Sequence, residues 1–246
     1  DILPHTNPIA VTNISLVGTV AIFCAILNTC SQLTAMQSRT IRIEVTGITI
    51  ITVRISIGAA IGVAIRISVG AAIGVTGDYI NRAAVLKAVG VDFLCVDVAH
   101  GHHSMMRDAL KHLKEEYGGD THIMAGNVAT GQGSLDLASW GADSIRVGIG
   151  GGSICSTRLV SGHGVPTLQS IIDCVTAGCP VPIIADGGMK TSGDVVKALA
   201  AGADFVMLGS MLAGTDQAPG QVFDNGNKKY KVYRGMASSE AQVNWR

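Results

Sequence analysis

Residues 93–127 read FLCVDVAHGHHSMMRDALKHLKEEYGGDTHIMAGN, and this stretch decides the fold class. Residues 93–97 are a short apolar run that predicts a buried strand, and residues 122–125 predict a second one. Between them, residues 104–117 predict a helix. A helix between two buried strands is typical of a parallel sheet with helices packed against it. We therefore expect an α/β fold.

The same alternation continues on both sides of this stretch. Further helices are expected at residues 79–89, 133–140, 168–177 and 193–201, and further strands at residues 144–147, 181–185 and 205–208. The strand ends are followed by polar residues or glycines, namely Asp97, Asn127, the loop from Gly148, Asp186 and Gly209-Ser210. In a (β/α)8 barrel, or TIM barrel, these ends form one face, which holds the active site. We predict this barrel. A doubly wound sheet is the alternative, and it would scatter these residues less symmetrically.

The N-terminal part of the chain has a different composition. Residues 6–38 hold no charged side chain, and residues 14–27 are nearly all apolar. Polar residues interrupt this run, and a membrane helix needs about 20 consecutive apolar residues, so we expect a buried barrel strand that leads into a buried helix. Residues 41–75 alternate β-branched and polar residues, which predicts strand. They contain a near-duplicate, residues 53–63 and 65–75, and two copies are too few for a solenoid.

The overall composition limits the class of protein. The chain has 246 residues, which suits a single barrel domain over residues 1–246, because such barrels have about 250 residues. Its 18 Lys+Arg balance 18 Asp+Glu, so the charge gives no reason to expect nucleic acid or a membrane as partner. With 48% apolar and 15% charged residues, the bulk of the chain is not disordered. Six cysteines without a Cys-x-x-Cys pair indicate a reducing, cytoplasmic setting.

The first candidate site is the glycine-rich loop Gly148-Ile-Gly-Gly-Gly-Ser-Ile-Cys155-Ser-Thr-Arg158. Glycines allow backbone amides and carbonyls to approach a ligand closely. A cysteine after such a loop acts as a nucleophile if its thiolate is stabilised. A buried structural thiol is the other interpretation of Cys155, and it is the one that we give to Cys24, Cys95, Cys174 and Cys179.

Two further groups of residues suggest binding sites. Glycines follow the last two predicted strands, in Ala185-Asp-Gly-Gly188 and Met207-Leu-Gly-Ser210. Such late barrel loops commonly bind phosphate through backbone N–H groups, although two tight turns would use the same residues. The histidines of His100-Gly-His102-His103 suggest zinc, but no acidic or thiol partner lies at ligand spacing in the sequence. A loop over the barrel mouth is the other interpretation of these histidines.

Seven motifs, in the same order, make the chain between about Val69 and Met236 resemble the IMP dehydrogenase and GMP reductase family. They are VGAAIG from Val69, DVAHGH from Asp97, AGNVAT from Ala125, the loop Gly148–Arg158, ADGG from Ala185, MLGS from Met207 and YRGM from Tyr233. Each motif alone is weak evidence, but seven motifs in the family's order make the resemblance strong. Residues 8–19 are similar to a diverged copy of the family's first barrel strand, with Ser15 where Asp is usual.

The resemblance implies a covalent mechanism at the purine base. Cys155 would attack C2 of the purine as a thiolate, which allows hydride exchange with a nicotinamide, NAD or NADPH. Thr157 would help to position or activate the group that enters or leaves C2. The remaining implied substrate-binding residues are Ser153, Gly188, Gly209, Ser210 and Tyr233 for the 5′-phosphate, Asp186 for the ribose, and Gly235 and Met236 near the base.

The resemblance also implies sites for the dinucleotide and for an ion. Asp97 and Asn127 would face the dinucleotide. In dehydrogenase members a potassium ion is held by backbone carbonyls, which correspond here to those of Gly150, Gly152 and Cys155. The family further implies a homotetramer whose substrate is a purine nucleoside monophosphate.

The sequence departs from the family pattern in three places. Gly151 stands where proline is common. Only about 30 residues separate Gln37 from Val69, so we expect no regulatory CBS module between the second and third strands. The mobile flap whose Arg-Tyr pair activates water in dehydrogenases would lie beyond Arg246.

The residues leave two reactions open. The AHGH and GNVAT stretches, from Ala99 and Gly126, are similar to bacterial IMP dehydrogenases, which convert IMP to XMP. Asn13, residues 17–19, the missing module and Glu240 favour GMP reductase, which converts GMP and NADPH to IMP and ammonia. We prefer the dehydrogenase. Because the first 68 residues match the family poorly, a nucleotide-binding barrel without activity is the non-enzyme alternative.

Overall fold

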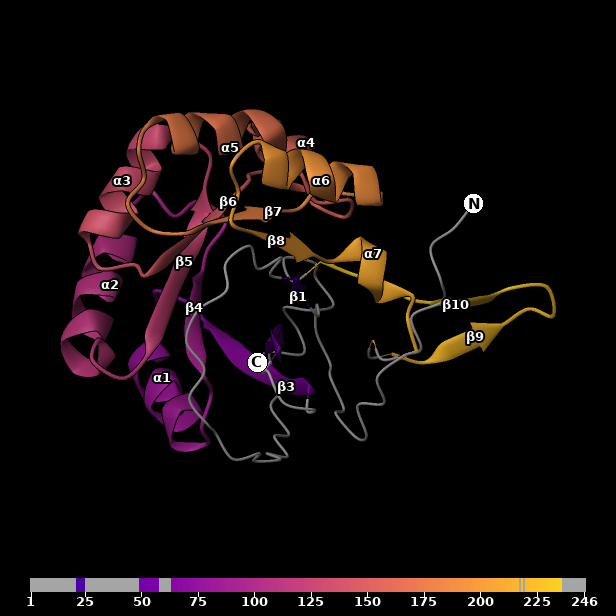
Figure 1. Ribbon diagram of the computed structural model, residues 1–246, viewed down its shortest axis with the longest axis horizontal. Helices are drawn as coiled ribbons and strands as arrows, with labels where there is room; N and C mark the ends of the chain where they lie inside the picture. Colours follow the sequence, from indigo (N-terminus) through magenta and orange to yellow (C-terminus); the bar gives the residue numbers. More distant parts are fainter. Residues whose placement is uncertain (1–20, 25–48, 58–62, 217, 219, 236–246) are drawn as a thin grey trace.

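The computed structural model describes residues 21–24, 49–57, 63–216, 218 and 220–235 (Figure 1). Eight strands close into a barrel in chain order. They are β1 (Ala21–Cys24), β2 (Thr49–Ile57), β3 (Val63–Ile73), β4 (Phe93–Asp97), β5 (His122–Val128), β6 (Ser144–Val147), β7 (Ile183–Asp186) and β8 (Phe205–Leu208). The helices are α1 (Tyr79–Ala88), α2 (Ser104–Tyr117), α3 (Gly131–Ser139), α4 (Thr157–Ser161), α5 (Thr167–Thr176), α6 (Ser192–Ala200) and α7 (Ser210–Ala213).

Strands β3 to β8 pair parallel with one another, and helices lie between them on the outside of the barrel (Figure 1). This confirms the predicted barrel, and because the sheet closes, the doubly wound alternative is wrong. Two strands depart from the all-parallel pattern: β2 pairs antiparallel with β3, and β1 pairs antiparallel with β8. Only residues 58–62 connect β2 to β3, whereas a parallel crossover needs a dozen or more residues. So short a connection favours antiparallel pairing.

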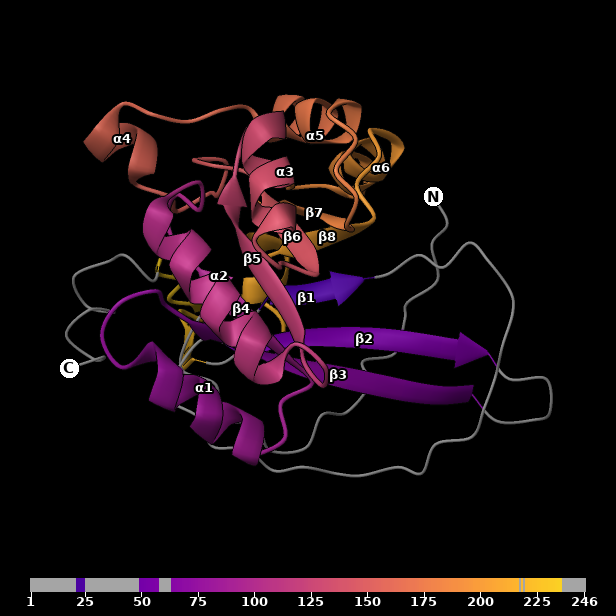
Figure 2. The same ribbon diagram turned by 90° about the vertical axis from the view of Figure 1, so that its left-hand side faces the viewer.

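The near-duplicate in the sequence falls on this strand pair. The two Arg-Ile-Ser segments face each other across it, with Arg54 opposite Arg66 in the register. Figure 2 shows β2 and β3 extending well beyond the other strands. The second copy enters the barrel at Gly70, which pairs with Phe93, and a β-carbon on Gly70 would collide with the Phe93 ring. The strand predicted for residues 41–75 is thus confirmed at residues 49–57 and 63–73, whereas residues 74–75 lie beyond the end of β3.

The strand pleat separates two groups of core residues. In β4, Leu94 and Val96 face outward into the cluster shared with the helices, whereas Phe93 and Cys95 face the barrel interior. Such alternation is expected because successive side chains of a strand point to opposite faces. The interior cluster is Phe93, Cys95, Met124, Ile184 and Met207, with Phe205 packed against it. The same alternation determines which polar side chains point into the barrel interior.

Side-chain caps fix where several helices begin. The His103 ring accepts a hydrogen bond from Met105 N at the start of α2, and Thr130 accepts one from Gly133 N at the start of α3. Helix α6 has a capping box between Thr191 and Asp194. Each cap satisfies a backbone N–H that would otherwise lack a partner. These helix starts also set the length of the loops above the barrel.

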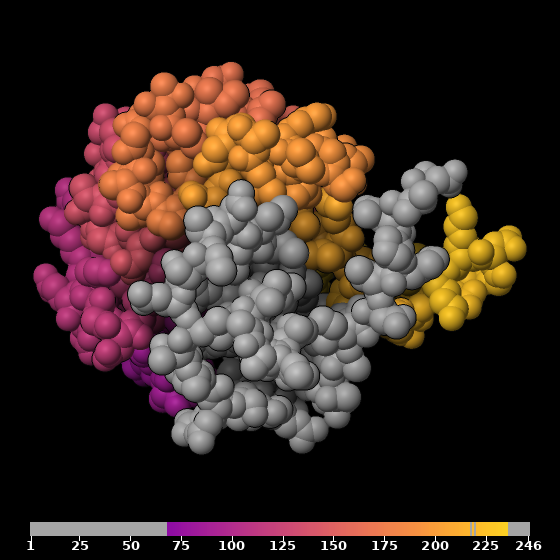
Figure 3. Space-filling model, viewed as in Figure 1, coloured from indigo at the N-terminus to yellow at the C-terminus, as the bar shows by residue number. Residues whose placement is uncertain are grey.

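Most predicted elements lie where the sequence placed them. Strands β4, β6 and β8 and helix α2 occupy the predicted residues, and the other predicted elements from residue 79 onward differ by up to three residues at an end. Helices α4 and α7 and the hairpin of β9 (Val222–Asp224) and β10 (Lys229–Lys231) were not predicted. This hairpin stands out from the body of the molecule (Figure 3). The strand-to-helix run predicted at residues 14–27 overlaps β1, and the rest of it lies outside the described residues.

The described helices also bear on membrane association. Within residues 63–216, where all of them lie, no helix is both long enough and apolar enough to cross a membrane.

Candidate active site

The candidate site lies at the carboxyl ends of β4 to β8. The pleat directs three charged residues into the barrel interior there: Asp97, Arg146 and Asp186. Asp97 follows the inward Cys95 by two positions, and Asp186 follows the inward Ile184 in the same way. Polar interior groups at the strand ends are the usual basis of a site in this fold.

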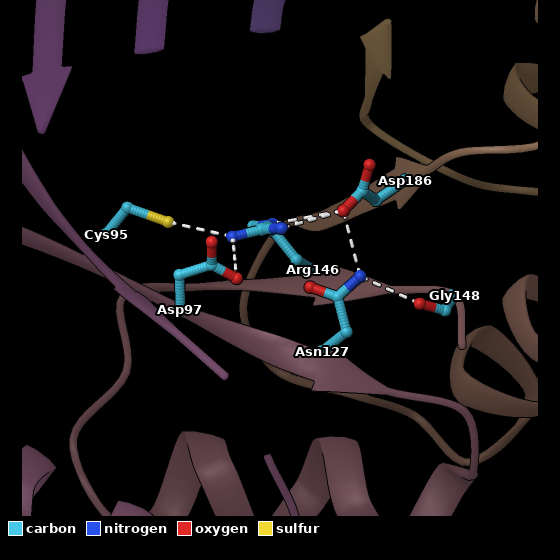
Figure 4. A network of polar contacts seen from close by, with 6 residues as sticks. All are labelled: Cys95, Asp97, Asn127, Arg146, Gly148 and Asp186. Carbon is cyan, nitrogen blue, oxygen red and sulfur yellow. Dashed lines mark hydrogen bonds and ion pairs between the residues drawn. The ribbon is translucent and has the colours of Figure 1, made fainter. Parts of the chain in front are cut away.

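Arg146, on β6, is at the centre of these contacts (Figure 4). Its Nη1 lies 3.0 Å from Asp97 Oδ1, and its Nη2 lies 2.8 Å from Asp186 Oδ2. Nη1 also donates to the Cys95 sulfur over 3.1 Å. One guanidinium therefore joins carboxylates from two strands that are not neighbours in the barrel, β4 and β7.

Asn127 adds a second link to Asp186. Its Nδ2 donates to Asp186 Oδ2 over 2.8 Å and to the Gly148 carbonyl over 2.7 Å. Figure 4 shows the other Asp186 oxygen pointing away from both Arg146 and Asn127. Asn127 Oδ1 is buried and has no hydrogen-bond partner in the structure. A buried acceptor without a partner is costly, so this oxygen is suited to accept a bond from a ligand.

Burial differs across the network. The Arg146 side chain is 9% exposed, whereas those of Asp97 and Asp186 are 27% and 19% exposed. Burial acts to lower the pKa of Arg146, but the nearby Asp97, Cys95 and Asp186 outweigh it and raise that pKa above its ordinary value. Burial also raises the pKa of the Cys95 thiol to about 11, so this thiol stays neutral at physiological pH. Of the three charged side chains, the two carboxylates are thus more accessible to a ligand than Arg146.

Two glycines allow this close packing. A β-carbon on Gly126 would lie 2.6 Å from Arg146 Cβ, so only glycine fits beside the arginine. Gly148 has φ +138°, and a β-carbon there would collide with the Asp186 carbonyl oxygen. L side chains rarely adopt such a φ. The loop that begins at Gly148 therefore starts in contact with β7.

Cys155 ends this glycine-rich loop. Its backbone N–H donates to the Gly152 carbonyl over 3.1 Å, and its Sγ lies 3.2 Å from Thr157 Oγ1, at the first residue of α4. Cys155 is half-buried, whereas Cys95 and Cys174 are fully buried. Burial raises the pKa of Cys174 to about 11 as well. Exposure therefore favours the nucleophile over the structural-thiol interpretation for Cys155.

The predicted phosphate-binding residues come together from different loops. A β-carbon on Gly209 would lie 2.7 Å from the Tyr233 hydroxyl. Burial and the negative charge of Asp186 raise the pKa of Tyr233, and a hydrogen bond with Ser153 partly offsets them. The loops after β6 and β8 and the segment after β10 thus converge near Asp186. This convergence is what a phosphate and ribose site requires.

The other predicted substrate-binding residues lie at different places around the site. Gly188, with φ +84°, packs next to Gly151, and Gly235 lies beside Ile154. Ser210 is exposed at the start of α7. Met236 lies outside the described residues.

The histidine motif has structural partners. His102 Nε2 lies 2.7 Å from Asp136 Oδ2 on α3, and His103 caps α2. Gly101 N donates to the Asn127 carbonyl over 2.6 Å, which holds the loop against the end of β5. In the part of the chain that the structure describes, no cluster of three or more His, Cys, Asp or Glu side chains could bind a metal ion. The geometry therefore favours a loop over the barrel mouth.

Sequence reasoning missed Arg146 and Thr167. The signal for Arg146 was present, because residues 144–147 are predicted to form a buried strand, and a charged residue inside a buried strand must have partners. Thr167 Oγ1 is buried without a hydrogen-bond partner, next to Gly151 and Gly188. No sequence pattern indicated that position.

Comparison with known proteins is consistent with this geometry. A family model described as IMP dehydrogenase / GMP reductase domain matches residues 18–245. An inosine-5′-monophosphate dehydrogenase of Nitrosopumilus maritimus is 50% identical over 171 residues, which are 69% of this chain and 36% of that protein. A GMP reductase of Leishmania major is 53% identical over 165 residues, 66% of this chain and 34% of that protein. The chain thus spans about a third of the length of these curated relatives.

A solved structure shows the same fold. The crystal structure of a GMP reductase variant from Trypanosoma brucei, in complex with guanosine 5′-monophosphate, superposes with a TM-score of 0.68 at 47% sequence identity. The match covers 71% of this chain and 37% of that one.

Proposed function

The chain belongs to the IMP dehydrogenase / GMP reductase family, and on that premise we propose that it binds a purine nucleoside monophosphate at the carboxyl face of the barrel and catalyses oxidation or reduction at C2 of the base. The presence of guanosine 5′-monophosphate in the related Trypanosoma brucei structure supports the substrate class. We assign the same nucleophile, Cys155, and the same nucleotide site to both reactions.

One observation carries the proposal. A half-buried thiol, Cys155, ends a glycine-rich loop whose Ser153 contacts Tyr233, and Tyr233 in turn lies against Gly209 and near Asp186. These groups can hold a phosphate and a ribose while the thiol faces the base. A purely structural role for Cys155 would not require an accessible thiol at that position.

The residues take the following parts in the reaction. The Cys155 thiolate adds to C2 and forms a C–S bond while the C2=N double bond opens. In the dehydrogenase direction C2 would then lose a hydride to NAD, which restores the double bond, and water would displace the sulfur; in the reductase direction ammonia would leave C2, a hydride from NADPH would take its place, and the thiolate would leave. Thr157, 3.2 Å from the sulfur, orients the group that enters or leaves C2. Asp186 accepts bonds from the ribose hydroxyls with the oxygen that points away from Arg146. The phosphate lies among the Ser153 and Tyr233 hydroxyls and the amides near Gly188 and Ser210.

The described residues fit a nicotinamide dinucleotide. The orphaned acceptor Asn127 Oδ1 and the accessible Asp97 carboxylate can both accept hydrogen bonds from its hydroxyl or carboxamide groups. When bound, the dinucleotide accepts or supplies the hydride at C2. NAD is our proposal for the dehydrogenase and NADPH for the reductase.

The loop also fits a potassium ion. The Gly152 carbonyl accepts one bond from Cys155 N–H and keeps a second lone pair for a cation, and we propose the carbonyls of Gly150 and Cys155 as the other ligands. A bound ion would stiffen the loop that carries the nucleophile. The homotetramer is a further prediction from the resemblance, and the cytoplasmic setting is a prediction from the cysteine usage.

Two reactions are candidates, and we prefer IMP dehydrogenase on the AHGH and GNVAT stretches. GMP reductase is the second candidate because proteins with that name from Leishmania major and Trypanosoma brucei match this chain at 53% and 47% identity. The test is to give the purified protein IMP with NAD, and separately GMP with NADPH, and to follow absorbance of the reduced nicotinamide. NADH formation from IMP supports the dehydrogenase, and NADPH consumption with GMP supports the reductase. Nucleotide binding without either reaction would support the inactive barrel.

A further inference from the structure

We infer that Arg146 is a positioning residue that couples the two halves of the site, by holding the Asp97 and Asp186 carboxylates in fixed positions. This inference rests on the proposed function, in which Asp97 faces the dinucleotide and Asp186 the ribose. Arg146 itself is nearly inaccessible, so it acts through these two partners.

Different nitrogens of the Arg146 guanidinium contact the two carboxylates. Nη1 pairs with Asp97 Oδ1, and Nη2 and Nε both point to Asp186 Oδ2, at 2.8 and 3.3 Å. The planar fork of arginine has donors in fixed directions, which lets one side chain orient two carboxylates at once. A lysine supplies the same charge from a single nitrogen and cannot reproduce this geometry.

The surroundings make Arg146 the link between Asp97 and Asp186. Cys95 occupies the remaining space beside Nη1, and its thiol is neutral because burial raises its pKa to about 11. Asn127 contacts Asp186 but, in the structure, donates its second bond to the Gly148 carbonyl instead of to Asp97. Movement of one carboxylate is therefore transmitted to the other through Arg146. A substitution at Asp97 should therefore alter the affinity for the monophosphate, and a substitution at Asp186 should alter the affinity for the dinucleotide.

Binding measurements can test this coupling without turnover. In a Cys155→Ala background, which cannot form the covalent bond, calorimetry gives the affinities for IMP and for NAD separately. We expect Arg146→Lys to weaken the binding of both ligands, each by about fivefold or more. Asp97→Asn should weaken NAD by about tenfold and IMP by about threefold, and the effect on IMP should vanish in the Arg146→Lys background.

A matched control removes a different ion pair. Lys114 Nζ lies 2.6 Å from Asp143 Oδ1, just before the amino end of β6, whereas the site lies at the carboxyl ends of the strands. Asp143→Asn should leave both affinities unchanged even if it lowers the melting temperature. A lower stability of the fold alone would therefore not reproduce the expected loss of affinity for IMP and NAD.

Each possible result either supports or overturns the proposed role of Arg146. Weakening of only one ligand, or of neither, by Arg146→Lys overturns the inference. If that variant does not fold, Asp97→Asn alone decides: a weaker IMP affinity supports the coupling, and an unchanged one refutes it. If the Cys155→Ala parent binds neither ligand, the proposed function fails, and the role of Arg146 fails with it.

Discussion

At the scale of single residues, burial separates cysteines that look alike in the sequence. Cys95 and Cys174 are fully buried, and burial raises the pKa of each to about 11. Cys155 is half-buried beside Thr157. A nucleophile has to be reached by its substrate, so only the second environment suits catalysis.

Replacing Cys155 should therefore remove the chemistry and keep the binding. We expect Cys155→Ala to abolish turnover in the nicotinamide absorbance assay while nucleotide affinity changes by less than about threefold. Cys179→Ala is the control, because Cys179 is also half-buried but its thiol lies near the Val181 and Ser134 carbonyls. Substantial activity in Cys155→Ala would show that no covalent step on this cysteine is needed.

A charge placed on the proposed phosphate loop should repel the substrate. Ser210→Glu puts a carboxylate at the exposed start of α7. We expect at least tenfold weaker binding of the monophosphate, about 1.4 kcal/mol, by calorimetry. Ser139→Glu adds the same charge at the end of α3, and it should change the affinity little. Equal effects of both variants would place the phosphate elsewhere.

At the scale of elements, the sequence predicts segments that have a clear burial pattern well and segments that lack one poorly. Strand β4 and helix α2 were predicted at their observed residues because burial gives each a clear pattern. Helix α4 has five residues, none buried, so no periodicity marks it. The hairpin of β9 and β10 did carry a signal that was missed: Asn225-Gly226 is a common hairpin turn, and Gly226 has φ +83°.

That hairpin is anchored by one lysine. Lys231 Nζ donates to the carbonyls of Thr215 and Ala218 over 2.7 and 2.6 Å, two residues before Tyr233. We expect Lys231→Met to release this segment, because charge-assisted bonds contribute about 1.5–3 kcal/mol each. Only part of this loss should reach the ligand, through Tyr233, so we expect monophosphate binding to weaken by about threefold to tenfold. Lys229→Met, at an exposed position of the same strand, should leave the affinity unchanged. An unaltered Kd in the Lys231 variant would show that Tyr233 is positioned by other contacts.

At the scale of the whole molecule, barrel closure explains what the sequence could and could not reveal. The order of strands and helices, and the polar strand ends Asp97, Asn127 and Asp186, could be read from the residue pattern. The contacts among them could not, because they depend on the pleat that turns Arg146 inward and on the distance between β4 and β7. The antiparallel pairing of β2 with β3 likewise depends on a short connection whose strand limits the sequence did not define.

The central claim is that Cys155 forms a covalent bond to the purine during the reaction. The most direct measurement is the mass of the intact protein, quenched with acid soon after mixing with IMP and NAD, followed by peptide mapping. We predict an added mass equal to the bound purine nucleotide, confined to the peptide that contains Cys155 and absent when NAD is omitted or when Cys155 is replaced by alanine. Steady NADH formation with no such adduct at any time of quenching, or an adduct on another cysteine, would contradict the account.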